Sequence, residues 1–258
     1  MIIITQEDYF FIPTNIEKII TRFGPSRVDM IIQIDSKGSI NNKKKLFFFG
    51  FGMFQSLKYG KAVLHKKTRI FFSKFFKQID DRIDSIQSIA DFHNIPFIRT
   101  YNINGSDIIE KLKKLNPEII ISFSAPTVFK ETILNLPKFG CINLHCSLLP
   151  SYAGLFPSFW VLNNKEEFTG CTVHKMDDKI DNGIILKQKI VTINEYETIF
   201  SLLSKTKLEG GNLMVDAIES IFNGTIQYKE NKLNEGSYYT WPTLNELRKF
   251  RRNGGRLI

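Results

Sequence analysis

The sequence has few cysteines and no long apolar run, and each shortage excludes a class of protein. Cys141, Cys146 and Cys171 are too few, and odd in number, for a disulfide framework, and they suit a reducing compartment. The longest dense apolar stretch, residues 46–54, is about half of the roughly 20 residues that a membrane-crossing helix needs. The start, MIIITQEDYFF, has neither a basic leader nor a small-residue cleavage site. We therefore expect a cytoplasmic protein.

The common nucleotide-binding and hydrolase motifs are also missing. No stretch fits G-x-G-x-x-G, G-x-x-x-x-G-K-[ST] or G-x-S-x-G. The sequence therefore gives no support to a dinucleotide-binding turn, a P-loop or a nucleophile elbow, and any chemistry must come from other residues.

Acidic residues are absent from one segment, residues 36–79, which contains eleven of the 35 Lys and Arg residues and many Phe. This segment alone supplies the positive net charge, since the rest of the chain has 24 basic and 26 acidic residues. Three interpretations remain open. Its 37–77 portion could contact tRNA through phosphates and base stacking, or an anionic membrane through an amphipathic helix. It could also be a helical pair with buried Phe and a solvated Lys face.

What is present is a regular alternation of short apolar and amphipathic segments, which predicts strands alternating with helices. The predicted strands are 1–5, 28–35, 96–100, 118–124, 139–146, 169–176 and 184–192, and the predicted helices include 15–23, 107–115, 157–162 and 197–222. This order indicates a Rossmann-like, doubly wound α/β fold with a mostly parallel sheet. We expect one domain over 1–224, with a kink at Gly210-Gly211, and a short extension over 225–258 that packs on it.

The most informative stretch is GCINLHCSLLPSYAGLFPSFW, residues 140–160. Because side chains alternate along a strand, Asn143 and His145 share one face. Polar side chains near the carboxyl end of a central strand lie where open α/β sheets bind ligands. Pro150 and Gly154 then predict a tight loop whose backbone approaches a ligand closely.

A zinc site is an alternative interpretation, because the spacings of Cys141 to His145 and of Cys171 to His174 superficially resemble those of zinc ligands. If 169–176 is a strand, however, Cys171 and His174 point to opposite faces and cannot reach one ion. We therefore expect no metal and treat the cysteines as small buried hydrophobes. Asp181, before Asn182-Gly183, fits a turn residue when judged by spacing alone.

Taken together, these elements resemble a known signature. Asn143-Leu144-His145 is followed in order by SLLPSYAG and TGCTVHKMDDKIDNGIIL. The order and spacing resemble the 10-formyltetrahydrofolate-dependent formyltransferases, the family that includes methionyl-tRNA, glycinamide ribonucleotide and sugar-nucleotide formyltransferases. The resemblance covers residues 117–224. It implies a formyltransferase fold and 10-formyltetrahydrofolate as the formyl donor.

The resemblance also implies a catalytic set of Asn143, His145 and Asp181. Asn143 would donate its amide N–H to the developing oxyanion, and His145 would stabilise that charge or move a proton from the amine. Asp181 would hold the imidazole or position a relay water, and His174 is expected to be structural. The remaining implied residues are Ser124, Thr127, Phe129, Asp177, Asp178 and Gly183 for the folate, and Ser147, Tyr152 and Gly154 for the acceptor.

The acceptor is the open question. The residues after Gly224 are too few for the C-terminal barrel usual in the tRNA enzyme. Near its start the chain has TQEDYFFIP, residues 5–13, where that enzyme has a Gly-Thr-Pro-Glu-Phe-Ala-type motif. Both departures favour a small amine, foremost an amino sugar linked to a nucleotide, with methionyl-tRNA second. Two alternatives to a transferase stay open: a hydrolase that passes the formyl group to water, and a non-catalytic folate or RNA-binding module. The chain could also form a homodimer.

Overall fold

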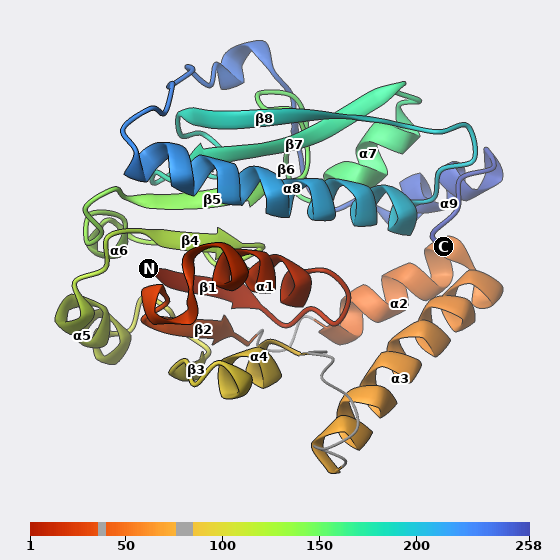
Figure 1. The fold of residues 1–258 in the computed structure, drawn as a ribbon. Helices are drawn as coiled ribbons and strands as arrows, with labels where there is room; N and C mark the ends of the chain where they lie inside the picture. Colours follow the sequence, from red (N-terminus) through yellow and green to blue (C-terminus); the bar gives the residue numbers. More distant parts are fainter. Residues whose placement is uncertain (36–39, 76–84) are drawn as a thin grey trace.

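The computed structural model describes residues 1–35, 40–75 and 85–258 and contains a seven-stranded sheet in these residues (Figure 1). In spatial order the strands are β3 (Phe97–Thr100), β2 (Met30–Ile34), β1 (Ile2–Gln6), β4 (Ile120–Phe123), β5 (Cys141–His145), β7 (Phe168–Lys175) and β8 (Ile185–Thr192). β1 to β5 pair in parallel, while β7 pairs antiparallel with both β5 and β8. The predicted mostly parallel α/β sheet is confirmed.

Helices cover both faces of the sheet. The described helices are α1 (Ile12–Phe23), α2 (Ile40–Phe51), α3 (Met53–Phe75), α4 (Ile86–Phe92), α5 (Ser106–Leu115), α6 (Glu131–Leu134), α7 (Pro157–Asn163), α8 (Ile199–Phe222) and α9 (Leu244–Arg252). α1, α4 and α8 pack on one face, and α5 and α6 pack on the other.

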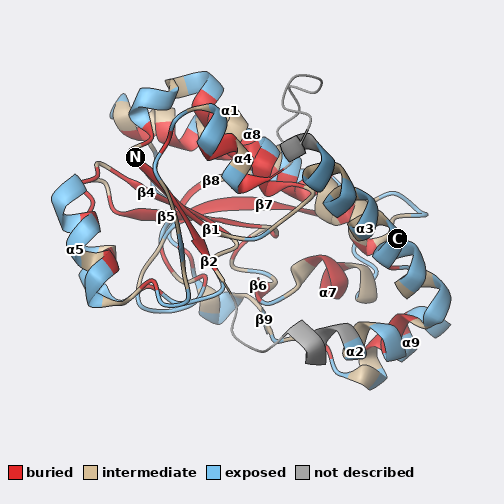
Figure 2. Cartoon of the chain, turned by 90° about the horizontal axis from the view of Figure 1, so that it is seen from below, coloured by how far each residue is buried: buried red, intermediate tan, exposed pale blue. Residues whose placement is uncertain are grey.

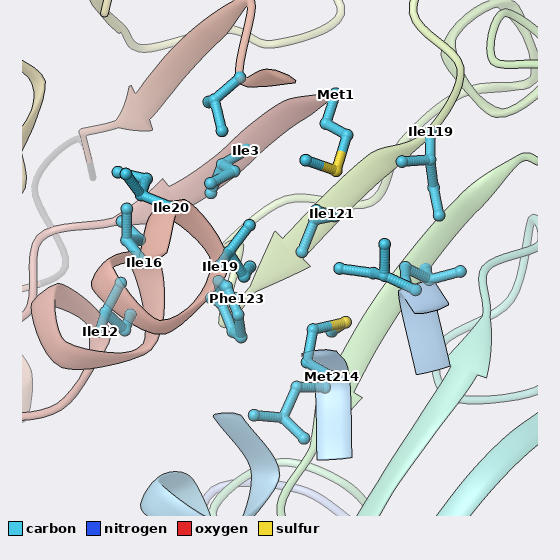
Figure 3. Close-up of a cluster of buried hydrophobic side chains, with 14 of the residues drawn as sticks. Met1, Ile3, Ile12, Ile16, Ile19, Ile20, Ile119, Ile121, Phe123 and Met214 are labelled. Carbon is cyan, nitrogen blue, oxygen red and sulfur yellow. The ribbon is translucent and has the colours of Figure 1, made fainter. Parts of the chain in front are cut away.

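Strand alternation explains how one short strand supplies two cores. In β1, Ile3 packs with Ile16, Ile19 and Met214 of α1 and α8 (Figure 3), whereas Ile2 faces the α5 side. All of these side chains are fully buried. A strand buried on both faces must be apolar throughout, which is why MIIIT reads as a continuous apolar run.

α8 is one continuous helix through Gly210 and Gly211, the position at which the sequence predicted a kink. The two glycines instead allow close approach to the sheet and to α1. A Cβ on Gly210 would lie 2.6 Å from Leu144 Cδ1, and one on Gly211 would lie 2.1 Å from Asn15 Oδ1. They are therefore packing glycines.

The C-terminal residues pack on the rest of the chain. β9 (Tyr238–Tyr239) pairs in parallel with β6 (Ala153–Gly154), which lies in the tight loop predicted at Pro150 and Gly154. α9 packs against α2, and its buried Leu247 and Phe250 share a cluster with Phe51 and Phe159.

The basic, Phe-rich segment forms the helical hairpin α2–α3, as one of the three interpretations predicted; positions 36–39 and 76–79 of it lie outside the described residues. Phe51 is buried, but Phe48, Phe49 and Phe54 are exposed, so the expected burial of Phe holds for only part of the hairpin. Within the described ranges, no helix combines the length and apolarity needed to cross a membrane.

Candidate active site

β5 brings Asn143 and His145 to the carboxyl edge of the sheet. The parallel register sets Asn143 beside Ser122 of β4, and the antiparallel register sets it beside His174 of β7. His145, the last residue of β5, is buried, and Asn143 is half-buried. Both residues therefore lie on a central strand, where the parallel part of the sheet meets the antiparallel part.

Asp181 reaches this edge from the loop between β7 and β8. Its carboxylate, 8% exposed, lies 3.3 Å from Nδ1 of His145 through Oδ2 and 3.5 Å from Nε2 of His174 through Oδ1. Oδ2 also accepts a hydrogen bond from the backbone N–H of Gly154 at 2.8 Å. The structure thus brings the three residues of the predicted catalytic set to one place, with His174 beside them.

The ring of His145 faces an acceptor on each side. Nε2 lies 2.9 Å from the carbonyl oxygen of Tyr152, and Nδ1 faces the Asp181 carboxylate. A neutral ring satisfies only one of these contacts by donating a proton, whereas a protonated ring donates to both. The two oxygen atoms therefore fix the orientation of the His145 ring.

His174 connects the carboxylate with the amide. Its Nε2 lies 3.2 Å from Nδ2 of Asn143, and its Nδ1 lies 3.1 Å from the carbonyl oxygen of Lys175. With the proton on Nδ1, Nε2 accepts from Asn143; with both nitrogens protonated, Nε2 faces Asp181 as a donor. The structure thus places His174, expected from the sequence to be structural, in contact with two members of the predicted catalytic set.

The environment keeps Asp181 ionised. Burial alone raises its pKa, but the charge of His145, the hydrogen bond and charge of His174 and the Gly154 N–H outweigh burial and lower the pKa to about 2. The site therefore contains a fixed negative charge between two imidazole rings.

Asn231, from the C-terminal extension, holds the backbone of the Asp181 loop. Its Nδ2 donates to the carbonyl oxygens of Asp181 at 2.7 Å and of Gly183 at 3.2 Å. Asp181 has a φ of 53°, in the left-handed region that costs a non-glycine residue energy. Sequence reasoning missed Asn231, because nothing in the pattern links a residue 50 positions away to this turn.

The loop after β4 contains three of the predicted folate residues. Ser124 follows the strand with a φ of 53°, and its hydroxyl accepts a hydrogen bond from Nζ of Lys207 at 3.1 Å. Thr127 is exposed. The Phe129 side chain is fully buried in the core on the α5 side, which leaves only its backbone for a ligand contact.

A partly buried ion pair contacts this loop through Ser124. Nζ of Lys207 lies 3.3 Å from Oδ2 of Asp8, whose Oδ1 accepts from the backbone N–H groups at the start of α1. Burial acts to raise the pKa of Asp8, yet Lys207 and these N–H groups lower it. Sequence reasoning missed the pair because its members are 199 residues apart.

The second predicted folate loop, 177–183, has hydrogen bonds within itself besides those from Asn231 and Gly154. Asp177 accepts from the backbone N–H of Lys179 and from Nδ2 of Asn182, while Asp178 is exposed. A Cβ on Gly183 would lie 1.7 Å from the carbonyl oxygen of Lys175, so only glycine fits there.

The predicted acceptor residues shape the loop that follows β5. The Ser147 hydroxyl is buried and donates to the carbonyl oxygens of Ser151 and Tyr152. A Cβ on Gly154 would lie 2.2 Å from the carbonyl oxygen of Tyr239. The close approach predicted at Gly154 therefore comes from the chain's own β9. Only Tyr152 of the three leaves part of its side chain open.

The alternation argument against a shared Cys171–His174 ligand pair agrees with the geometry. Cys171 packs in the core with Val173 and Leu186, while His174 faces Asp181. Of the residues described, no three His, Cys, Asp or Glu side chains form a group suited to hold a metal ion.

The sequence profile of the family described as formyl transferase matches residues 60–218, more than half of the chain. The chain belongs to this family. Among its formyl transferase relatives, the methionyl-tRNA formyltransferase of Thermotoga maritima is 36% identical over 154 residues, which are 59% of this chain and 49% of that protein. The bifunctional polymyxin resistance protein ArnA of Wigglesworthia glossinidia brevipalpis is 40% identical over 172 residues, 66% of this chain and 23% of that protein.

Solved formyl transferases have the same fold. The N-formyltransferase of Helicobacter canadensis, crystallised with folinic acid and dTDP-3-aminofucose, superposes with a TM-score of 0.61 at 22% identity. That match covers 93% of this chain and 70% of the other. The chain spans about half the length of the methionyl-tRNA formyltransferases it matches.

Proposed function

We propose that this chain transfers a formyl group from 10-formyltetrahydrofolate to an acceptor amine. The observation that supports the proposal most is the convergence of Asn143, His145, His174 and Asp181 at the carboxyl edge of β5, with neighbouring polar atoms 3.2 to 3.5 Å apart. Membership of the formyl transferase family and the folinic acid bound by the Helicobacter canadensis enzyme support the same donor class.

The reaction sets two requirements that these side chains can meet. When the amine attacks the formyl carbon, the carbonyl oxygen gains negative charge, and a proton must move from the amine to the leaving folate nitrogen. Asn143 has a side-chain N–H group to donate to the oxyanion. A positively charged His145, two residues further along the same strand, adds electrostatic stabilisation of the oxyanion.

Asp181 makes the imidazoles effective proton carriers. Because its carboxylate stays ionised, a proton received by His145 or His174 is stabilised at once by a charge 3.3 or 3.5 Å away. The backbone contacts of both rings fix their orientation, so the site is preorganised before the substrates bind.

We propose an amino sugar linked to a nucleotide as the acceptor. In the loop that follows β5, the ring of Tyr152 stacks on Tyr239 at 5.3 Å between centroids, and Tyr239 stacks on Trp160 at 4.7 Å. Tyr239 lies between the other two rings and Trp160 is buried, so the half-buried Tyr152 is the ring of the three that we expect to meet the sugar or base of such a molecule. Methionyl-tRNA is the second candidate, and it is favoured by the 36% identity to the Thermotoga maritima enzyme.

The test is to incubate the protein with 10-formyltetrahydrofolate and single amines while tetrahydrofolate release is followed by absorbance and the product by mass spectrometry. The panel contains nucleotide-linked amino sugars, methionyl-tRNA and an amine-free control. We expect release only with a nucleotide-linked amino sugar, together with a product 28 Da heavier than the acceptor, the mass by which formyl replaces hydrogen.

The other outcomes separate the alternatives. Release without amine would make the protein a hydrolase, and release only with methionyl-tRNA would establish the second acceptor. If no member of the panel gives turnover while the folate still binds, the chain is a binding module and the transfer proposal is wrong.

A further inference from the structure

α3 is apolar on two sides, and the body of the protein covers only one of them. On the covered side, the ring of Tyr59 packs with Phe10 and Phe200, each at 6.3 Å between centroids, and Gln55 accepts a hydrogen bond from the backbone N–H of Leu257. Figure 1 shows the α2–α3 hairpin at the end of the molecule opposite α5, and Figure 2 shows α3 mostly exposed or half-buried. A helix with an apolar face in water calls for a partner on that face.

The uncovered side carries a stripe of large apolar side chains. At 100° per residue, Met53, Leu57 and Leu64 fall within a strip about 40° wide, and Phe54 and Phe72 flank it on one side. All five side chains are more than half exposed. We call this set the α3 stripe. Scattered single apolar residues are ordinary on a surface, but a continuous stripe along a helix marks an interaction site.

The charges around the α3 stripe select an anionic partner. Lys58 and Lys61 are exposed beside it, and Lys67 borders its other edge with Nζ 5.3 Å from the ring of Tyr9. From Ile40 to Phe75 the chain has nine Lys or Arg residues and no Asp or Glu. Two copies joined through this face would place lysines opposite lysines without compensating carboxylates, so the charge disfavours a second copy of this chain.

The chemistry of the central side chains favours lipid over RNA. Met53, Leu57 and Leu64, the majority of the stripe, have no aromatic face on which a base could stack, and stacking supplies much of the affinity for single-stranded RNA. Phe54 and Phe72 do have such a face, but phenylalanine is equally suited to the apolar side of a helix that lies on a membrane. Aliphatic side chains flanked by lysines instead match the boundary between acyl chains and anionic headgroups. α3 is not apolar enough to cross a bilayer, so it would lie along the surface.

We propose that the α3 stripe binds an anionic lipid surface. Met53, Leu57 and Leu64 enter the acyl boundary while Lys58 and Lys61 contact the headgroups. This interaction goes beyond the proposed formyl transfer and uses none of the residues of the catalytic set.

The test is vesicle flotation of the full chain at 0.15 M salt, with vesicles of phosphatidylcholine alone or with one quarter phosphatidylglycerol. We expect binding to the anionic vesicles only. Lys58→Gln/Lys61→Gln should lower the bound fraction by roughly tenfold, and Leu57→Gln/Leu64→Gln should lower it at least as much. The matched control is Lys111→Gln/Lys114→Gln/Leu115→Gln on α5, at the opposite end of the molecule, which should change nothing.

The same proteins give the contradicting outcomes. Absence of flotation with anionic vesicles overturns the proposal, as does binding that the lysine variant weakens but the leucine variant leaves unchanged. Binding to unfractionated tRNA that disappears in the leucine variant would assign the stripe to RNA. A dimer in sedimentation analysis that the leucine variant dissociates would assign it to a second copy. Circular dichroism confirms that each variant is folded.

Discussion

A single buried carboxylate between two imidazole rings organises the site. Asp181 contacts His145 and His174 and is itself held by the Gly154 N–H, so removing its charge alters both rings at once. The sequence identified Asn143, His145 and Asp181 through their motif. It led us to expect a structural role for His174, because a histidine on a buried strand is more often a packing residue.

The lowered pKa of Asp181 makes a prediction about acid stability. A carboxylate whose pKa falls from 3.8 to about 2 on folding stabilises the folded state at pH values above 3.8, and that stability is lost as the pH falls toward 2. We expect Asp181→Asn to lower the free energy of unfolding near pH 5 by about 2 kcal/mol, with the difference disappearing near pH 2. Urea unfolding of both proteins across this range measures it. A difference that stays constant with pH would show that the charge is not responsible.

At the scale of elements, the site depends on how strands pair and on one contact from the C-terminal extension. The alternation of apolar and amphipathic segments sufficed to predict the seven strands of the sheet, since each is bounded by polar residues. The antiparallel pairing of β5 with β7 could not be predicted, because about 20 residues of loop and helix separate the two strands. That pairing is what places His174 beside Asn143.

Asn231 gives the second prediction. Because it holds the carbonyl oxygens of Asp181 and Gly183, Asn231→Ala should release the turn and lower kcat by about tenfold, with a smaller change in KM. Asn234→Ala, an exposed neighbour, serves as the control. Steady-state kinetics on the folded proteins make the comparison. Equal kcat values for wild type and Asn231→Ala would restrict Asn231 to a structural role.

At the scale of the whole molecule, segments far apart in the sequence share one cluster beside the sheet. Phe51 of α2, Phe159 of α7 and Leu247 of α9 pack together, so the basic hairpin and the C-terminal extension support each other. The sequence indicated that the extension would pack on the main domain, because it is too short for its own core. The partner helix could not be predicted, since no local pattern reports a contact between residues about 200 positions apart.

Substitution of Leu247 tests how much this cluster contributes to stability. It is fully buried, and a Cβ on Gly50 would lie 2.7 Å from its Cβ, so the packing there is close. Leu247→Ala should lower the free energy of unfolding by about 2 to 4 kcal/mol, while Lys249→Ala, exposed on the same helix, should change it by less than about 0.5 kcal/mol. Urea denaturation compares them. Equal effects of the two substitutions would mean that α9 contributes little to stability.

The central claim is that the polar set on β5 and the β7–β8 loop carries out formyl transfer. The most direct measurement is the single-turnover rate of formyl transfer, with the amine identified by the panel, in wild type, Asn143→Ala and His145→Ala. We predict that each substitution lowers the rate by about 10²- to 10³-fold while the circular dichroism spectrum is unchanged. A near wild-type rate in either folded variant would contradict the account.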